Sequence, residues 1–211
     1  MAKEYVKTVY RLKLERIAKH LEGNQFAASV FDTKEEAAAF LKQVIPPGSS
    51  VGIGGSVTLD EMGVVKWLRS DPEIRFIDRY SMPDKKQAFR ESLLADVYLM
   101  SSNAVTMDGY LYNVDGTGNR VAALIYGPDK VYVACGRNKI VKDAEEAKSR
   151  VEEIAAPANC ARLEKENPCT KTGSCMHCSL PTTICNQFVL SRRSGVPGRI
   201  HVLLINEELG L

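Results

Sequence analysis

The residues best suited to chemistry lie in a polar, glycine-rich connection that runs from Ser101 to Gly136. Within it, the carboxyl groups of Asp108 and Asp115 are candidates for a general acid or base. Arg120 can pair with a carboxylate or a phosphate. Each aspartate also belongs to an Asp-Gly turn dipeptide, and Arg120 also suits a surface position. Asp108, Asp115 and Arg120 are therefore the catalytic candidates, with the purely structural alternative left open.

The loop that precedes Arg120 has the composition of an anion-binding turn. Two glycines let the backbone approach a ligand closely, and the loop runs directly into an apolar stretch typical of a helix. Thr117 or Asn119 can cap that helix, whose first N–H groups would face the loop. The alternative is a turn that only reverses the chain. We predict ligand binding by these residues of the region: Asn113, Asp115, Gly116, Thr117, Gly118, Asn119 and Arg120.

A second glycine-rich turn, Gly54-Gly55-Ser56, follows a short apolar run and precedes a predicted helix. Glycine N–H groups can approach an anion, and the Ser56 hydroxyl adds a donor. The turn matches neither a Walker loop nor a dinucleotide fingerprint, so a plain tight turn is the alternative. We predict that its three residues bind the same ligand. Lys139, which follows a later strand, either points into this pocket or lies on the surface.

Four cysteines, Cys169, Cys175, Cys178 and Cys185, have the spacing C-x5-C-x2-C-x6-C. A C-x2-C turn lets two thiolates hold one metal, and the flanking cysteines can complete a zinc site or an iron–sulfur cluster. A second C-x2-C is absent from the sequence, and Cys160 adds a further nearby thiol. Lasting disulfides are disfavoured in a cytosolic chain. The alternatives to a metal site are redox-active thiols and plainly packed cysteines.

The elements that must position these residues alternate between strand-like and helix-like patterns. Short apolar runs predict strands at 51–53, 74–77, 97–100, 131–134 and 200–205. The alternation predicts an α/β fold with a mainly parallel sheet and helices on both faces, plus a small β-hairpin insert at 105–114. Ligands of such sheets bind beyond the carboxyl ends of the strands. We therefore expect one pocket to be lined by Gly55, Ser56, Asp108, Asn113, Asp115, Gly116, Asn119 and Arg120.

A single domain accounts for all 211 residues, because a chain of this length can bury one sizeable core. Residues 1–48 carry two predicted helices. The first is amphipathic from Lys3 to Leu21, and a Thr33/Glu36 capping box opens the second. The first helix packs on its own core or docks on a second copy in a homo-oligomer. Residues 157–193 form an irregular, cysteine-rich appendage that begins where Pro157 stops a helix.

Charge and hydropathy exclude two classes of partner. The chain has 28 Lys and Arg against 26 Asp and Glu, a net charge of +2, which is too balanced for a nucleic-acid binder. No apolar run of the sequence reaches the length of a membrane span or a signal core. We therefore expect a soluble, cytoplasmic protein that does not bind nucleic acid and has no membrane span.

Three stretches resemble the LUD (lactate-utilisation) domain family in its single-domain form: NAVTMDGYLYNVDGTGNRVAALIYGPDKVYVACGRNKIV, PCTKTGSCMHCSLPTTIC and PGRIHVLLINEELGL. The resemblance covers roughly residues 51–211. It implies a fold similar to the sugar-phosphate isomerase and coenzyme A transferase superfamily. In that superfamily a glycine-serine loop after the first strand binds substrate, and Gly54-Gly55-Ser56 has a similar position. The resemblance also implies a link to bacterial lactate oxidation, without a defined reaction.

Two classes of function follow from these features. In the first, the protein binds a small anionic metabolite, a hydroxy acid or a phosphorylated compound, and can do acid–base chemistry on it. In the second, it is an accessory component of a lactate-oxidising complex, where the cysteines carry an iron–sulfur cluster or zinc or dock a partner protein. The glycine loops favour the first class, and the cysteines favour the second. Whether the protein is an enzyme is open at this stage.

Overall fold

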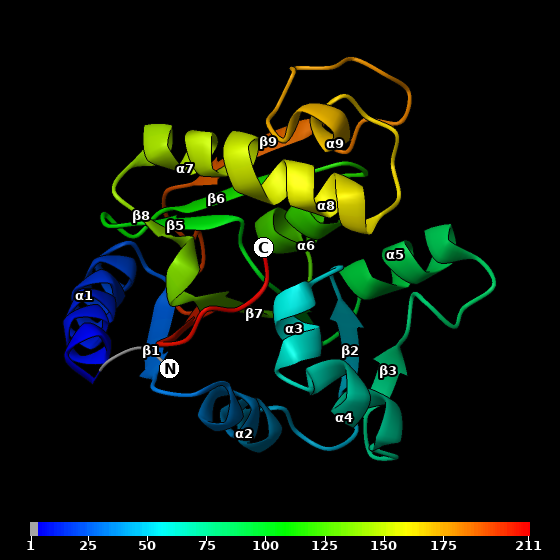
Figure 1. Cartoon of the computed structure of the whole chain (residues 1–211). Helices are drawn as coiled ribbons and strands as arrows, with labels where there is room; N and C mark the ends of the chain where they lie inside the picture. Colours follow the sequence, from blue (N-terminus) through cyan, green and yellow to red (C-terminus); the bar gives the residue numbers. More distant parts are fainter. Residues whose placement is uncertain (1–3) are drawn as a thin grey trace.

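Six parallel strands form the central sheet of the computed structural model, which describes residues 4–211 (Figure 1). Their order across the sheet is β1-β10-β7-β4-β2-β3. The strands are β1 (Ala27–Phe31), β2 (Ser50–Ile53), β3 (Arg75–Ile77), β4 (Val97–Met100), β7 (Lys130–Gly136) and β10 (Ile200–Ile205). The predicted α/β fold with a mainly parallel sheet is confirmed. The edge strand β1 is an addition, because only helices are predicted within residues 1–48.

Helices cover both faces of this sheet because side chains alternate along each strand. Val97 and Leu99 pack against the helices of one face, whereas Tyr98 and Met100 point to the other. The first face carries α2 (Lys34–Val44), α3 (Val57–Glu61) and α4 (Val64–Ser70). The second carries α1 (Glu4–Gly23), α5 (Lys85–Leu93) and α6 (Asn119–Tyr126). No helix within residues 4–211 is long and apolar enough to cross a membrane.

The two N-terminal helices form for the predicted reasons. Helix α1 buries Leu14, Ile17 and Leu21, which are one turn apart on the same face; Lys3, where the predicted helix begins, lies outside the described residues. The capping box of α2 is present in full, because the Thr33 hydroxyl accepts from the Glu36 N–H and the Glu36 carboxylate accepts from the Thr33 N–H.

A second sheet of four strands, in the order β8-β5-β6-β9, lies between the central sheet and α7 (Figure 1). Its strands are β5 (Ala104–Thr106), β6 (Leu111–Asp115), β8 (Ile140–Val141) and β9 (Gln187–Ser191), and the 3-10 turn η1 (Arg137–Lys139) precedes β8. The predicted hairpin is the antiparallel pair of β5 and β6. These two strands are the middle of the four-stranded sheet. Strand β9 lies within residues 157–193, so the cysteine-rich appendage is not wholly irregular as predicted.

One long helical segment covers this second sheet, and it does not stop before Pro157 as predicted. It runs through α7 (Ala144–Arg150), the π-helical turn η2 (Val151–Ala155) and α8 (Ala156–Arg162), and the short α9 (Cys169–Thr172) follows. In η2 the Ala156 N–H donates to the Val151 carbonyl, five residues back. Pro157 has no N–H to continue this pattern, so the Glu152 carbonyl is free to accept from the Cys175 N–H at 2.9 Å.

Candidate functional site

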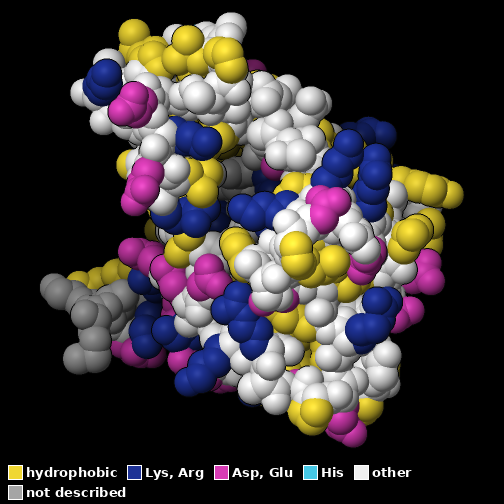
Figure 2. All heavy atoms as spheres, turned by 90° about the vertical axis from the view of Figure 1, so that its right-hand side faces the viewer, with side chains coloured by type: hydrophobic (Ala, Val, Ile, Leu, Met, Phe, Trp, Pro, Cys, Tyr) yellow, Lys and Arg dark blue, Asp and Glu magenta, His cyan; other side chains and the backbone are white. Residues whose placement is uncertain are grey.

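A pocket of about 260 Å³ lies at the carboxyl ends of four neighbouring strands of the central sheet, β7, β4, β2 and β3. The loops after these strands line it, and residues of α8 close it from the other side. Strand order reverses here, because the chain passes from β2 to β3 on one side and then to β4 on the other. Such a reversal opens a crevice in α/β sheets. Figure 2 shows a hollow on this side of the molecule with Lys and Arg side chains around it.

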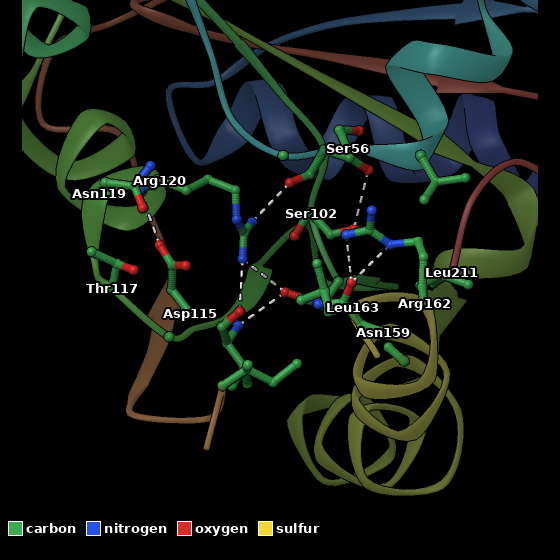
Figure 3. Close-up of a pocket in the computed structure, with 18 of the residues that line it drawn as sticks. Ser56, Ser102, Asp115, Thr117, Asn119, Arg120, Asn159, Arg162, Leu163 and Leu211 are labelled. Carbon is green, nitrogen blue, oxygen red and sulfur yellow. Dashed lines mark hydrogen bonds between the residues drawn. The ribbon is translucent and has the colours of Figure 1, made fainter. Parts of the chain in front are cut away.

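Arg120 lies buried at the centre of the lining (Figure 3). Its guanidinium group donates to the carbonyls of Ser101 and Val114 at 2.9 and 2.8 Å, and to the side-chain oxygens of Asn103 and Asn113. All four acceptors are neutral. Burial lowers the pKa of Arg120 despite the nearby Asp115 carboxylate, yet a guanidinium stays charged in proteins. The centre of the pocket therefore holds a positive charge that is fixed in place.

Gly54 is needed for this arrangement. A Cβ added at Gly54 would lie 3.0 Å from the Arg120 Cγ and Cδ atoms, which is closer than ordinary contact. The missing side chain therefore lets the Arg120 stem pass beneath the end of β2. Gly54 and Asn113 thus support Arg120 from behind and do not face the cavity.

Asp115 caps helix α6, which corrects the predicted capping by Thr117 or Asn119. Its Oδ2 accepts from the N–H groups of Arg120 and Val121 at 2.9 and 3.2 Å. The N-cap position itself is Gly118, which has a φ of 89° and no side chain, so a carboxylate from earlier in the loop takes the role. The first N–H groups of α6 already have an anionic partner within the chain, and Asp115 has a structural task.

Lys139 is the second buried cation of the pocket. Its Nζ donates to the Ser101 and Thr58 hydroxyl oxygens at 2.9 and 3.0 Å, and its side chain is 4% exposed. Burial lowers its pKa to about 8, and the nearby charges of Arg150 and Arg120 act in the same direction. Of the two sequence-based alternatives for Lys139, the structure therefore has the one that points into the pocket.

Two further arginines line the pocket, and sequence reasoning missed both. Arg79 follows β3, and its guanidinium lies over the Phe89 and Tyr80 rings at 4.7 and 5.3 Å. Arg162 ends α8, and its Nε and Nη2 both donate to the Asn159 Oδ1 at 3.1 and 2.7 Å (Figure 3). Arg79 lies just beyond the strand predicted at 74–77, and this position could have identified it as a pocket residue. Among the described residues of the lining, four are cationic, while Asp115 is the only carboxylate side chain.

The structure brings most of the predicted ligand-binding residues together around this pocket. Those in the lining are Gly55, Ser56, Asp115, Gly116, Thr117, Asn119 and Arg120. Gly118 faces a separate surface hollow. Asp108 does not belong to the site: it is exposed at the turn between β5 and β6, where its carbonyl accepts from the Asn24 side chain at 2.9 Å. A hairpin turn lies at the opposite end of the strands from Asp115, so the two cannot share a pocket.

A second pocket, of about 210 Å³, contains five of the six cysteines in its lining. They are Cys160, Cys169, Cys175, Cys178 and Cys185, and all are free thiols. We call it the cysteine pocket, and the first one the strand-end pocket. Within residues 4–211, no three Cys, His, Asp or Glu side chains converge closely enough to hold a metal ion. A metal site formed by Cys169, Cys175, Cys178 and Cys185 stays a prediction.

The two pockets share a wall. Helix α8 presents Asn159 and Arg162 to the strand-end pocket and Cys160 to the cysteine pocket. Likewise Ile184 lines the first, while its neighbour Cys185 lines the second. The wall is close-packed at this point, because a Cβ added at Gly116 would lie 3.2 Å from the Ile184 Cα. The segment that carries Cys185 therefore packs directly against the strand-end pocket.

Fold and site together define an α/β protein with a cationic pocket at the ends of its parallel strands. The chain belongs to the LUD domain family, whose family model matches residues 14–205. It is similar in structure to a DUF162 family protein from Deinococcus radiodurans, with a TM-score of 0.54 and 15% sequence identity over 93% of this chain and 98% of that chain. No curated protein matches.

These comparisons confirm the resemblance that the three sequence stretches indicate, and they carry it toward the N-terminus, into α1. At 15% identity the likeness to the solved structure shows the fold alone. Membership of the LUD family supports a role related to lactate utilisation.

Proposed function

We propose that this protein binds a small anionic metabolite, a hydroxy acid or a phosphorylated compound, in the strand-end pocket. One observation carries the proposal: Arg120 and Lys139 are buried in the lining, and the side-chain hydrogen bonds of both go to neutral oxygens. Burying a charge is costly unless an opposite charge accompanies it. The nearby Asp115 carboxylate is already engaged with the first N–H groups of α6, so an anionic ligand would supply a further opposite charge and its binding would be favoured.

The size and rim of the pocket support the same class of ligand. A volume of about 260 Å³ lies just below the roughly 300–1,000 Å³ typical of drug-sized ligands. The lining includes the Ser56 and Thr117 hydroxyl groups, which can hold a ligand hydroxyl or phosphate oxygen. Arg162 and Arg79 also line the pocket, and a guanidinium can form two parallel hydrogen bonds with a carboxylate or phosphate.

Lys139 is the best candidate for acid–base chemistry at this site, in place of the aspartates. With a pKa of about 8, its Nζ can both hold and release a proton near neutral pH, as general acids and bases must. Ser101 accepts from that Nζ at 2.9 Å, so a proton could pass between the amine and a hydroxyl group of the pocket. Asp115 is engaged with α6 and Asp108 lies elsewhere.

Thermal unfolding of the purified protein tests the proposal. L-lactate, D-lactate, inorganic phosphate and a sugar phosphate would each be added at equal ionic strength, with chloride as the reference. A ligand of the folded state at a hundred times its Kd adds about 2.7 kcal/mol of stability. We expect at least one of these anions to raise the melting temperature in a saturable manner. No saturable shift with any of them would contradict binding of this ligand class.

The cysteine pocket favours a second candidate function, that of an accessory component in a lactate-oxidising complex. Five thiols around one cavity are more than the packing of a core requires. A redox or metal centre there would serve such a role without turnover at the strand-end pocket. If no anion stabilises the protein and the cysteine pocket binds a redox-active metal centre, this second candidate replaces the first.

A further inference from the structure

The cysteine pocket combines a rigid side and a loop. Cys160 lies on helix α8 and is 1% exposed, whereas Cys175, Cys178 and Cys185 are half-buried on the segment that follows α9. Cys169 opens α9 and is buried. The remaining lining is mixed: Val151, Ala156, Met176 and Phe188 are apolar, and Glu152, Asn167, His177 and Thr183 are polar. A cavity with five thiols in its lining, contributed by both the helix and the loop, suits a sulfur-rich group.

The loop is fixed to the helix at a specific point. Because Pro157 has no N–H, the Glu152 carbonyl is available, and it accepts from the Cys175 N–H at 2.9 Å. Two residues further on, His177 has a φ of 48°, which is uncommon for a residue other than glycine. This conformation directs the His177 N–H to the Cys175 sulfur at 3.4 Å. Backbone donors aimed at sulfur stabilise thiolate ligands.

The arrangement of the thiols decides between a single ion and a cluster, because no three Cys, His, Asp or Glu side chains within residues 4–211 converge closely enough to hold one ion. Four thiolates on one zinc bind it at about 2.3 Å and leave no room around it. Five cysteines instead line a cavity of about 210 Å³, which is more than ten times the roughly 10–15 Å³ of cavity volume that holds one water molecule. An iron–sulfur cluster adds bridging sulfides and further irons between the cysteines, and each cysteine binds a different iron. Thiols spread around a cavity of this size match that requirement.

We propose that the cysteine pocket binds an iron–sulfur cluster through Cys169, Cys175, Cys178 and Cys185. These four lie on one stretch with few large apolar side chains, so metal–thiolate bonds would offset the entropy lost when the loop is ordered. Cys160 is not a ligand. It lies on helix α8, outside this loop, is only 1% exposed, and lines the cavity from the helix side.

The test is to purify the full chain without oxygen and reconstitute it with ferric iron, sulfide and an excess of a small thiol, which reduces the part of the iron that a mixed-valence cluster needs. We expect the broad visible absorbance of an iron–sulfur cluster, with two or four irons and an equal number of sulfides per chain. Cys175→Ser and Cys178→Ser should lose the iron and the colour. Cys135→Ser is the matched control and should keep both, because Cys135 is buried in β7 away from the cavity. Stoichiometric zinc without sulfide, or no bound iron, would overturn the proposal.

The ligand set needs a second pair of variants. Cys160→Ser should retain the cluster, and Cys169→Ser should lose it. Both cysteines are buried, so circular dichroism must first show that each variant is folded. If Cys169→Ser is folded and retains the cluster while Cys160→Ser loses it, the fourth ligand is Cys160 and the proposed set is wrong. The partly exposed Cys175 and Cys178 keep the site testable if either buried variant fails to fold.

Discussion

The strand-end pocket and the cysteine pocket lie on either side of one helix but are built in different ways. The first is held by the ends of four parallel strands, and Arg120 joins its parts through four hydrogen bonds. The second is closed largely by one loop, which a backbone hydrogen bond from Cys175 ties to η2. A rigid frame can prepare a site before its ligand arrives. A loop of small and polar residues gains much of its order from the group that it binds.

The largest expected effect concerns this loop. Replacing Cys175 and Cys178 together with serine should make the segment between Asn167 and Asn186 strongly sensitive to proteolysis, because the loop loses the cluster that orders it. Limited proteolysis with mass spectrometry locates the cuts. Cys135→Ser, handled identically, should resist the protease as the original chain does. Equal resistance in all three reconstituted proteins would mean that packing alone holds the loop, and the contrast between the two pockets would disappear.

The next effect is on the rigid frame. Arg120→Met should lower the free energy of unfolding by about 3–5 kcal/mol, because three buried oxygens and one partly buried oxygen lose their donor. Urea unfolding measures the change. Arg162→Met is the matched control at an exposed position of the same pocket, and its stability should change by no more than about 0.5 kcal/mol. Similar losses in both variants would show that Arg120 does not organise the strand-end pocket.

A smaller effect is expected from pH. Burial lowers the pKa of Lys139 to about 8, so the amine is mostly charged at pH 7 and mostly neutral at pH 9. Anion affinity should therefore be highest below pH 8 and fall above it, by up to about tenfold per pH unit for one linked proton. Titration calorimetry at several pH values measures this slope. Lys139→Met should abolish it, and Lys66→Met, at an exposed position on α4, should leave it intact.

The lowered pKa of Lys139 also makes the stability of the ligand-free protein depend on pH. Lysine titrates near 10.4 when unfolded, so the unfolded chain binds more protons than the folded one between about pH 8 and 10.4. The contribution of Lys139 to stability therefore rises with pH through this window, opposite in direction to the expected fall in anion affinity. Unfolding curves of the original chain and of Lys139→Met, both without ligand, measure the effect of pH on stability separately from its effect on anion affinity.

The smallest expected effect tests the shared wall. Removal of the cluster should weaken anion binding a few-fold, because Ile184, which lines the strand-end pocket, is next to Cys185. A coupling of this size corresponds to roughly 1 kcal/mol. Calorimetric titrations of the metal-free and reconstituted forms provide the comparison. Identical affinities would show that the strand-end pocket is independent of the loop.

The strands of the central sheet were largely predictable from the sequence, whereas several residues of the strand-end pocket were not. Apolar runs bounded by turn residues identified β2, β3, β4, β7 and β10. Strand β1, with the sequence AASVF, lacks a clear alternation and has small residues of low β-propensity. It forms because it pairs with β10 at the sheet edge.

Arg162 was unpredictable for a different reason. Pro157 normally ends a helix, and only the π-helical turn η2 lets the segment continue to Arg162 and reach the strand-end pocket. Asp108 was grouped with Asp115 because both carboxyl groups lie in the same polar, glycine-rich connection. Composition alone does not show which end of a hairpin a turn occupies, and the strand pairing places them at opposite ends.

The central claim is that the strand-end pocket is a ready-made anion site, and titration calorimetry with Arg162→Ala tests it most directly. The anion that stabilises the protein most would be titrated into the original chain, into this variant and into Arg16→Ala, an exposed arginine of α1. Loss of a charge-assisted hydrogen bond of about 1.5–3 kcal/mol should weaken binding to Arg162→Ala by roughly ten- to a hundredfold. Arg16→Ala should bind as the original chain does. Unchanged affinity in a folded Arg162→Ala would contradict the claim.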